Sequence, residues 1–252
     1  MCPSYRATRN EKDSTRGRAN ALREFLSRNE MANPFDQQEL YEVLELCLSC
    51  KGCTAECPSN VDMAKLKAEF LYQYYKTNPV PFRSKFFAQS AKLNALGSNF
   101  PGLTNFFLKN SVTGGLLKKM LNVAPQRPLP LLYKTTLFRW FQNNRQSLFG
   151  NQQGKSGTLY LFCDEVANFN DAELGIKTVK LLAHLGYDVK MLPWTDSARV
   201  HISKGLMREA RKTAKKNVEL FFPLVSEQVP LVGIEPSGIL GFRDEFPSLL
   251  RG

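Results

Sequence analysis

The sequence predicts a mainly α-helical protein, in which an all-helical first half is followed by a partial α/β domain built on a parallel sheet. Three observations lead to this fold class. Apolar residues recur at helical spacing through the first half, strand and helix patterns alternate in the second, and five of the six cysteines fall in the first half. With 252 residues, 43% of them hydrophobic, the chain is long enough for two modest domains and too apolar to be disordered.

The first half is predicted to contain five helices. They cover residues 16–28, 36–47, 62–78, 82–96 and 111–121. Asp36 opens a capping-box pattern with Glu39, and Asp62 is placed to cap the helix that follows it. The Phe, Leu and Lys residues between positions 82 and 121 are expected to cover a helical core. Contact with a membrane surface or with a quinone-side partner is the alternative for this stretch.

The second half alternates between short apolar strands and amphipathic helices. The predicted strands are residues 158–163, 187–192 and 231–234, and the predicted helices between them are residues 171–185 and 203–220. Strand–helix–strand alternation predicts a parallel sheet with crossover helices. Cys163, at the end of the first strand, is expected to be a buried packing thiol.

The expected domain boundaries follow the charges and the loop signals. Residues 1–121 form the helical domain with a net charge of +6, residues 122–157 a linker with +5, and residues 158–252 the α/β domain with a net charge of zero. Three prolines and a run rich in Asn, Gln and Gly are typical of a linker. The total of +11 suits a basic binding module as well as a redox protein.

Four cysteines carry the strongest functional signal. Cys47, Cys50, Cys53 and Cys57 follow the spacing C-x2-C-x2-C-x3-C-P of bacterial ferredoxins. The two-residue spacers let three thiolates converge on one iron–sulfur cube, and the proline turns the chain away. Zinc is the alternative, but zinc sites usually use two separated Cys pairs or Cys with His, and no His stands nearby. A 4Fe–4S cluster is therefore the expected cofactor.

The dipeptide Cys-Pro occurs twice, at Cys2 and at Cys57. In two-cluster ferredoxins the cysteine before the proline binds the cluster of the other half. On this basis Cys2 completes the cluster of Cys47, Cys50 and Cys53, and Cys57 belongs to a second cluster whose other ligands lie upstream. The helical domain is then a two-cluster ferredoxin-type domain truncated at its N-terminus, and the sequence is expected to be part of a longer protein. The alternative is that Cys57 closes a single cluster and Cys2 is incidental.

With these motifs, the chain resembles bacterial FAD-linked oxidases with a fused iron–sulfur region, such as D-lactate, glycolate and D-2-hydroxyglutarate dehydrogenase-like proteins. It is also similar to the iron–sulfur subunit of anaerobic glycerol-3-phosphate dehydrogenase. The resemblance is carried by Cys2-Pro-Ser-Tyr5, Thr15-Arg-Gly-Arg18, Cys47 to Cys57, Asn60 to Phe70, Leu161-Phe-Cys-Asp164, Ile202-Ser-Lys-Gly205 and Gly233-Ile-Glu-Pro-Ser237. The last three runs resemble the start of a cysteine-rich domain of heterodisulfide-reductase type.

The resemblance implies an iron–sulfur module that relays electrons from FAD to a quinone or another acceptor in a flavin-dependent 2-hydroxyacid dehydrogenase. FAD would lie in an upstream domain or partner subunit, so this chain alone is not expected to be catalytic. One alternative is a stand-alone iron–sulfur subunit of a glycerol-3-phosphate dehydrogenase or heterodisulfide reductase-like complex. A zinc-stapled basic binding module is another. No nucleic-acid partner is expected, because no reading helix or aromatic platform accompanies the cysteines.

The chain departs from the pattern of its relatives in the second half. Asp196-Ser-Ala-Arg199 stands where many relatives have a cysteine-containing run, and Gly238 stands where a cysteine often follows. These positions supply no thiolate, so no third metal or redox site is expected there.

Three basic residues stand close in sequence to the predicted ligands. Arg16, Arg18 and Lys51 are candidates to hold the negative charge of the cluster and raise its potential, and the alternative is that they are solvated. The expected location is cytoplasmic, with peripheral contact at the inner membrane, because no apolar signal sequence follows Met1 and the thiols fit a reducing compartment.

Overall fold

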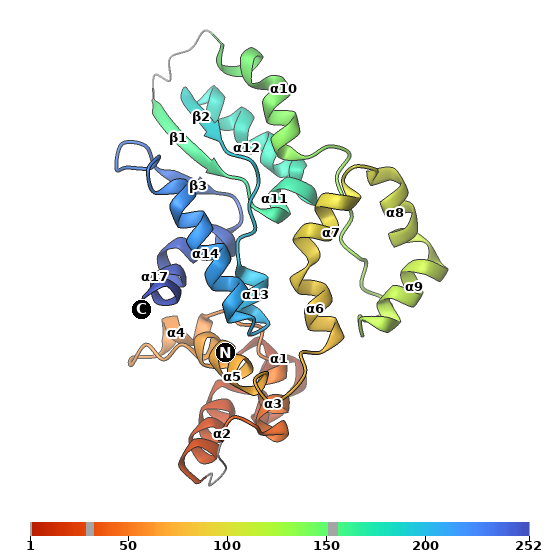
Figure 1. Ribbon diagram of the computed structural model, residues 1–252, viewed down its shortest axis with the longest axis vertical. Helices are drawn as coiled ribbons and strands as arrows, with labels where there is room; N and C mark the ends of the chain where they lie inside the picture. The colour runs from red at the N-terminus through yellow and green to blue at the C-terminus, as the bar shows by residue number, and fades with distance from the viewer. Residues whose placement is uncertain (1, 29–32, 151–155, 252) are drawn as a thin grey trace. The chain divides into compact units, whose positions relative to one another are not determined.

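The computed structural model describes residues 2–28, 33–150 and 156–251 (Figure 1). Within these residues it is mainly helical and contains a three-stranded parallel sheet, which confirms the predicted fold class. Two compact units divide the chain. The first unit consists of Met1–Pro81 with Val200–Ala210, and the second of Phe82–Arg199 with Arg211–Gly252. This division differs from the predicted boundaries at 121 and 157, because the helices after Pro81 cluster with the sheet.

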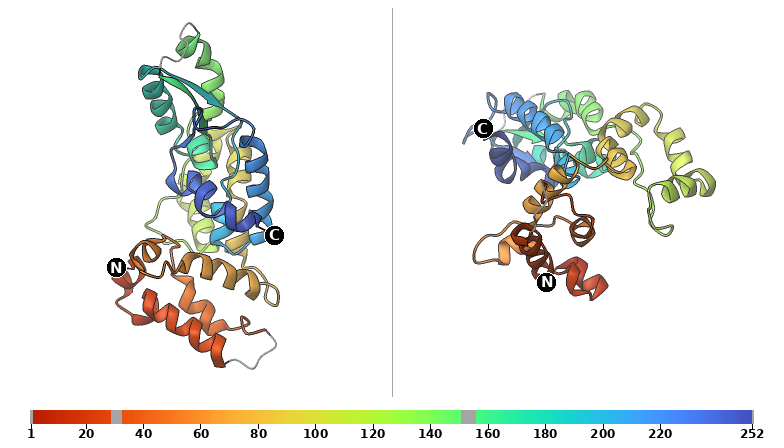
Figure 2. Two further views of the ribbon diagram at one scale, coloured as in Figure 1. Left: turned by 90° about the vertical axis from the view of Figure 1, so that its left-hand side faces the viewer. Right: turned by 60° about the horizontal axis from the view of Figure 1, so that its bottom comes forward.

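The first unit is a set of short helices, coloured red to orange in Figure 2. Its elements are α1 (Pro3–Thr8), the 3-10 helix η1 (Glu11–Asp13), α2 (Thr15–Arg28), α3 (Gln38–Glu45), α4 (Gly52–Glu56), α5 (Met63–Tyr74) and most of α13 (Arg199–Ser203). Its small core contains the buried side chains of Leu22, Leu40, Leu44, Met63, Phe70, Leu71 and Tyr74. The predicted cap of α5 is confirmed, because the Asp62 carboxylate accepts hydrogen bonds from the amides of Ala64 and Lys65.

The predicted start and end of α3 are wrong. The helix is preceded by Gln37, whose side chain makes no capping bond, while the Asp36 carboxylate instead accepts a hydrogen bond from the side chain of Asn78 at 2.6 Å. The helix also ends at Glu45 and does not continue through Cys47. Carbonyls at this end are engaged by side chains from other elements, which stops the helix before the first cysteine of the cluster motif.

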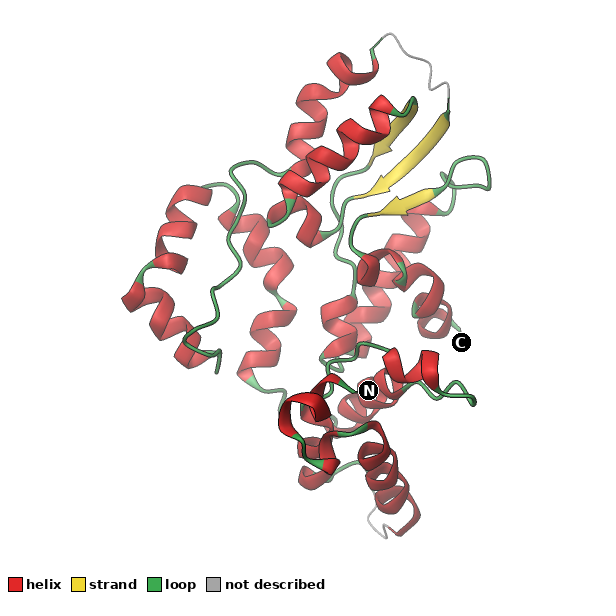
Figure 3. Ribbon diagram, turned by 180° about the vertical axis from the view of Figure 1, so that it is seen from behind, coloured by secondary structure: helices red, strands yellow, loops and turns green. Residues whose placement is uncertain are grey.

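The second unit contains the sheet and the remaining elements. These are α6 (Phe82–Ala88), α7 (Ser90–Gly97), α8 (Pro101–Lys109), α9 (Ser111–Met120), α10 (Leu137–Phe149), β1 (Gly157–Phe162), α11 (Glu165–Phe169), α12 (Ala172–His184), β2 (Tyr187–Met191), most of α14 (Met207–Phe221), β3 (Leu231–Gly233), α15 (Pro236–Ile239), α16 (Gly241–Asp244) and α17 (Phe246–Leu250). The strands lie side by side in the order β2-β1-β3, all parallel (Figure 3). The predicted helix 203–220 is broken at Gly205, where φ is +69°.

Alternation along β1 places different side chains on the two faces of the sheet. Leu159 and Leu161 are buried in the core formed with α10 and α12. Phe162 points to the opposite face, where its ring contacts Phe221 and Phe242 edge to face at centroid distances of 5.6 Å and 5.2 Å. The central strand is therefore covered on both faces, as a parallel strand requires.

The predicted linker is partly a structural helix. Helix α10 lies within residues 122–157, and its Leu137 and Phe141 are buried in the core under the sheet. Thr136 caps this helix by accepting a hydrogen bond from the Arg139 amide. The Asn/Gln/Gly-rich residues 151–155 lie outside the described residues. The sequence predicts a short docking helix between the linker signals, at residues 131–141, and the structure has α10 there, packed on α12.

The helical core expected from residues 82–121 is formed only in part: Ala88, Ala91 and Leu121 are buried, whereas α8 and α9 bury little. In α8 no side chain is buried, and in α9 only Gly114 is buried. The large apolar side chains of both helices are mostly exposed to solvent. The reason is that α8 and α9 pack mainly on each other, so two short helices have too few neighbours to cover their apolar residues. Within the described residues, no helix combines the length and the hydropathy needed to cross a bilayer.

A polar network lies where the parallel strands end. The Glu165 carboxylate, which is buried, accepts hydrogen bonds from the amide and hydroxyl of Ser197, each at 2.9 Å. The Arg199 guanidinium lies 3.4 Å from Glu165 and 3.0 Å from the Glu235 carboxylate. Burial, and after it the carboxylates of Asp196 and Asp164, raise the pKa of Glu165.

We expect Gly175→Ala to destabilise the second unit by about 1–3 kcal/mol. A Cβ at position 175 would lie 2.5 Å from Cδ2 of Leu137, whose side chain is fully buried and cannot move aside. The measurement is urea unfolding followed by circular dichroism. Gly115→Ala is the matched control, because nothing lies within 4 Å of the added carbon in α9. This control should be neutral or slightly stabilising. Equal effects of the two substitutions would contradict the close α10–α12 contact.

The raised pKa of Glu165 predicts a pH dependence of stability. Because the carboxyl loses its proton more easily in the unfolded chain, the free energy of unfolding should fall as the pH rises from the unfolded pKa, about 4.3, through the raised folded pKa. Glu165→Gln cannot ionise and should flatten that fall, measured by urea unfolding at a series of pH values. Glu173→Gln, at an exposed residue whose pKa is lowered by Lys177, should leave the slope above pH ~5 unchanged. If the free energy of unfolding of Glu165→Gln falls with pH as steeply as that of the wild type, the buried Glu165 carboxyl is not the cause of the fall.

Candidate metal centre

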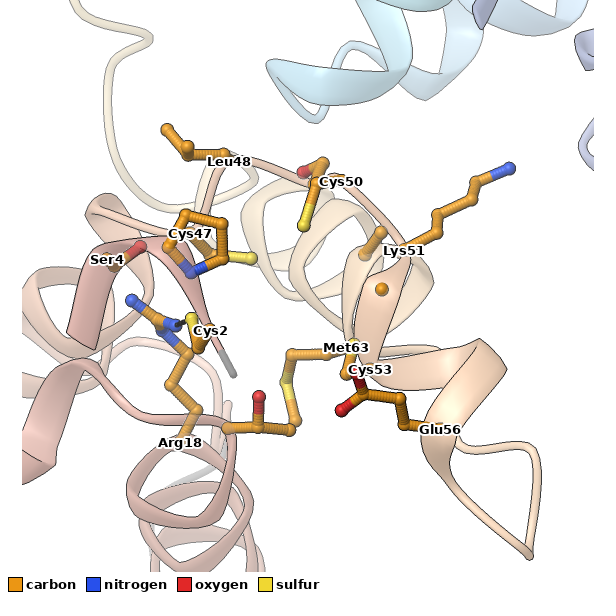
Figure 4. A pocket seen from close by; sticks show the side chains of 15 residues that line it. Cys2, Ser4, Arg18, Cys47, Leu48, Cys50, Lys51, Cys53, Glu56 and Met63 are labelled. Atoms are coloured by element: carbon orange, nitrogen blue, oxygen red, sulfur yellow. Dashed lines mark hydrogen bonds between the residues drawn. The ribbon is translucent and has the colours of Figure 1, made fainter. Parts of the chain in front are cut away.

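Four of the predicted ligands line one cavity in the first unit. Cys2, Cys47, Cys50 and Cys53 surround a space of about 170 Å³ (Figure 4). Cys2 precedes α1, Cys47 and Cys50 lie in the loop after α3, and Cys53 lies in α4. The fold therefore brings Cys2 beside three thiols that are at least 45 positions away in the sequence. Among the described residues, no three Cys, His, Asp or Glu side chains lie close enough together to bind a single metal ion.

The loop that carries Cys50 has an unusual backbone. Ser49 and Lys51, on either side of Cys50, both adopt left-handed conformations with φ of 55° and 59°. Such a conformation costs a residue other than glycine roughly 1–2 kcal/mol. It persists only where surrounding contacts fix the chain, and it is common at functional sites. Here it allows three thiols within seven residues to face the same cavity.

Lys67 of α5 fastens this loop to the core. Its ammonium donates hydrogen bonds to the carbonyls of Glu45 at 3.0 Å and Cys47 at 2.6 Å. The side chain is only 8% exposed, and burial lowers the pKa of Lys67 to about 8. Sequence reasoning did not single out this residue. The available signal was a lysine on the buried face of α5, three positions after Ala64 and four before Leu71.

Arg18 of α2 ties two parts of the site together. Its Nε donates to the Val43 carbonyl at 3.1 Å, and its Nη1 donates to the sulfur of Cys2 at 3.3 Å. The side chain is 1% exposed and forms a buried ion pair with Asp13, at 4.0 Å. The Ser4 hydroxyl adds a hydrogen bond to the Leu46 carbonyl. Side chains of α1, α2 and α5 thus satisfy carbonyls at the C-terminal end of α3, which the helix itself leaves unpaired.

The surroundings of Cys2 favour its thiolate, the form that binds iron. Burial by itself would raise the pKa of Cys2, but hydrogen bonds from the backbone of Tyr5, from Arg18 and from Ser4 lower it overall. The pKa of Cys57 is also lowered, by backbone hydrogen bonds of Val61, Ser59 and Asn60.

The three basic residues predicted near the cluster have different positions. Arg18 lines the cavity. Lys51 also lines it, but its ammonium points away from the thiols (Figure 4). Arg16 does not line it, because this exposed side chain forms an ion pair with Glu11 at 2.9 Å. The structure therefore places one of the three candidates, Arg18, against a predicted ligand.

The remaining two cysteines lie outside the cavity. Cys57 follows α4 and does not line it. Cys163 belongs to the core of the second unit, where it is 2% exposed and burial raises its pKa well above the ordinary range. A neutral buried thiol of this kind has the packing role expected for it.

Positions where the resemblance would place further cysteines converge in the second unit. A Cβ at Gly238 would lie 3.6 Å from that of Ser197 and 3.8 Å from that of Asp164. In this chain neither position carries a thiol, and the Ser197 hydroxyl donates a hydrogen bond to the Glu165 carboxylate. Relatives with cysteines at positions 197 and 238 would bring two thiols together here, whereas this chain has a hydrogen-bonded polar network.

The residues at the cavity fit an iron–sulfur cluster. Four soft sulfur donors from three elements surround a space larger than one ion, and only one carboxylate, that of Glu56, joins the lining. One buried arginine donates to a ligand sulfur, as second-layer partners do in such sites.

Comparisons with known proteins agree with this chemistry. Residues 1–61 match a protein family described as a 4Fe-4S dicluster domain. The chain is 26% identical over 287 residues to the D-2-hydroxyglutarate dehydrogenase of Escherichia coli (strain K12), with 98% of this chain and 28% of that protein covered. The enzymes of the same name from Pantoea ananatis and Haemophilus influenzae are each 25% identical, over 291 and 296 residues, with 99% and 100% of this chain and 28% of each enzyme covered. No solved structure matches the chain.

The chain spans 28% of the length of these curated relatives. The matches to them extend from the cysteine-rich helices through the thiol-poor sheet. Residues 1–61 thus match the family of 4Fe–4S dicluster domains, and nearly the whole chain is similar to part of the D-2-hydroxyglutarate dehydrogenases.

Proposed function

We propose that this chain is the iron–sulfur electron-transfer module of a flavin-dependent 2-hydroxyacid dehydrogenase. The observation that carries the proposal is the convergence of Cys2 on the cavity of Cys47, Cys50 and Cys53. A bound 4Fe–4S cluster would supply one-electron transfer at this place. The relatives named as D-2-hydroxyglutarate dehydrogenases indicate the substrate class of the whole enzyme, a 2-hydroxyacid.

The residues of the chain would bind the cluster and control its charge. The four thiolates hold it, and the bonds from Lys67 to the carbonyls of Glu45 and Cys47 keep the loop in place. Arg18 contributes a buried positive charge and a hydrogen bond to Cys2, both of which favour the more negative, reduced state. The electron donor in this proposal is an FAD-binding domain or subunit outside this chain, and the acceptor is a quinone or another carrier.

Cys57 is proposed to serve a second cluster. Its sulfur lies outside the cavity although it ends the same cysteine motif, and its pKa is lowered toward the thiolate form. The family that matches residues 1–61 is a dicluster domain, which supports a second site. In this proposal the other ligands of that second cluster come from polypeptide outside residues 1–252.

Iron analysis of cysteine variants tests the ligand assignment. The anaerobically purified chain should be brown and contain ~4 iron and ~4 sulfide per chain, as one cube requires. Cys2→Ala should lose most of this iron, whereas Cys57→Ala and the buried-thiol control Cys163→Ala should keep it.

The opposite pattern, with iron lost in Cys57→Ala and kept in Cys2→Ala, would show that the four cysteines of the motif hold a single cluster. A colourless protein with stoichiometric zinc would overturn the redox function and favour the zinc-stapled binding module. Two complete cubes per chain would contradict the assignment of Cys57.

Substitution of Arg18 should shift the cluster potential. In Arg18→Gln the loss of a buried charge and of the bond to Cys2 should lower the midpoint potential by up to about 65–130 mV, because a charged hydrogen bond is worth about 1.5–3 kcal/mol and about 1.4 kcal/mol corresponds to 59 mV for one electron. Arg18→Lys should shift it less, and the exposed Arg16→Gln should not shift it. The measurement is a redox titration followed by electron paramagnetic resonance. Unchanged potentials in both Arg18 variants would remove Arg18 from the proposed function.

A further inference from the structure

A large apolar surface is exposed on α8 and α9, which form a helical hairpin at the edge of the second unit (Figures 1 and 3). Between 56% and 75% of each side chain is open to solvent at Phe100, Leu103, Phe106, Val112, Leu116 and Met120. We call these six residues the hairpin face. Single exposed apolar side chains are normal on soluble proteins, whereas several on two consecutive short helices are a feature of interaction sites.

The hairpin face is held outward by contacts on its other side. Asn105 forms two hydrogen bonds with the backbone of Leu132, in which its amide donates at 2.7 Å and its carbonyl accepts at 2.9 Å. The Thr104 hydroxyl donates to the Gly97 carbonyl at 3.1 Å. Thr104 and Asn105 therefore attach α8 to the rest of the unit, while the apolar side chains of Leu103 and Phe106 stay exposed to solvent. On α9, the apolar residues 112, 116 and 120 recur every fourth position and so share one side of the helix.

The stretch of sequence that contains the hairpin has charges of a single sign. Between Glu69 and Asp164 the sequence contains no Asp or Glu and 12 Lys or Arg residues. On the hairpin itself the charged residues are Lys109, Lys118 and Lys119. Helices that lie in the interface of an anionic bilayer typically combine lysines with exposed Phe and Leu side chains.

We propose that the hairpin face binds the surface of an anionic phospholipid bilayer. The apolar side chains would enter the boundary between head groups and acyl chains, while Lys109 and Lys119 extend to the phosphates. The third lysine, Lys118, donates a hydrogen bond to the Pro125 carbonyl at 2.9 Å. A protein partner is less suited to this surface. Protein interfaces are enriched in aromatic residues, Met and Arg and depleted in Lys. The hairpin face has two Phe and one Met, but every charged residue of residues 84–121 is a Lys, and this stretch contains no Tyr, Trp or Arg. The proposal does not depend on the iron–sulfur assignment, because no cysteine belongs to the hairpin.

Vesicle flotation tests the proposal with the protein as isolated from its host. It should float with phosphatidylcholine vesicles that contain roughly one third phosphatidylglycerol, bind pure phosphatidylcholine much more weakly, and be released as salt rises from ~50 to ~500 mM. The combined substitutions Leu103→Gln, Phe106→Gln and Leu116→Gln should weaken partitioning at least about tenfold. Replacing Lys109 and Lys119 by Gln should weaken it about tenfold and reduce the salt dependence.

Matched controls separate this face from exposed residues in general. Leu174, Leu181 and Leu185, at or near α12, are each 52–57% exposed, and their combined replacement by Gln should leave partitioning unchanged. Replacing Lys212 and Lys216 of α14 by Gln is the control for charge. Failure of the wild-type protein to bind anionic vesicles at low salt would overturn the proposal. An equal loss of vesicle binding in the α12 control would also overturn it. So would a protein that does not bind vesicles but forms a dimer that the hairpin substitutions dissociate.

Discussion

The C-terminal end of α3 is the constraint on which the candidate metal centre depends. A helix leaves its last carbonyls without partners, and here those of Val43, Glu45, Leu46 and Cys47 are bonded by side chains from three other elements. Two of the donors are buried cations, which are stabilising beside the negative end of a helix. Because the same carbonyls begin the cysteine loop, the bonds that end the helix also fix the loop and bring Cys2 to it.

This arrangement links folding of the first unit to the chemistry of its cavity. Arg18 is buried beside Asp13 and the Cys2 sulfur, and Lys67 is buried against the carbonyls of Glu45 and Cys47. Buried charges of this kind are costly in an otherwise apolar core. A negatively charged cluster held by thiolates would compensate for this cost. Binding of such a cluster would therefore explain both the two buried cations and the left-handed backbone of Ser49 and Lys51 beside Cys50.

The two units use their polar side chains in different ways. In the first, polar side chains converge on a cavity lined with thiols. In the second, Ser197 and Gly238 lie side by side at the end of the sheet, where the Ser197 hydroxyl bonds to Glu165 and Arg199 forms ion pairs with Glu165 and Glu235. The sheet therefore keeps its parallel order and its two covered faces without a thiol site at its end. The apolar hairpin of α8 and α9, by contrast, adds no core and leaves a surface for contact.

The sequence by itself predicted the fold class, the strands and the cap of α5, because spacing and periodicity are local properties. It also named the four cysteines that line the cavity, whose role as cluster ligands stays a prediction. Only the tertiary structure decided which cysteine stays out of the cavity, that Arg18 and not Arg16 meets a ligand, and that Lys67 is buried beside Cys47. It also decided that α10 belongs to the core while the apolar residues of α8 and α9 stay exposed. The physical reason is that burial depends on how many neighbours an element finds in space, which residue type and spacing along the chain do not specify.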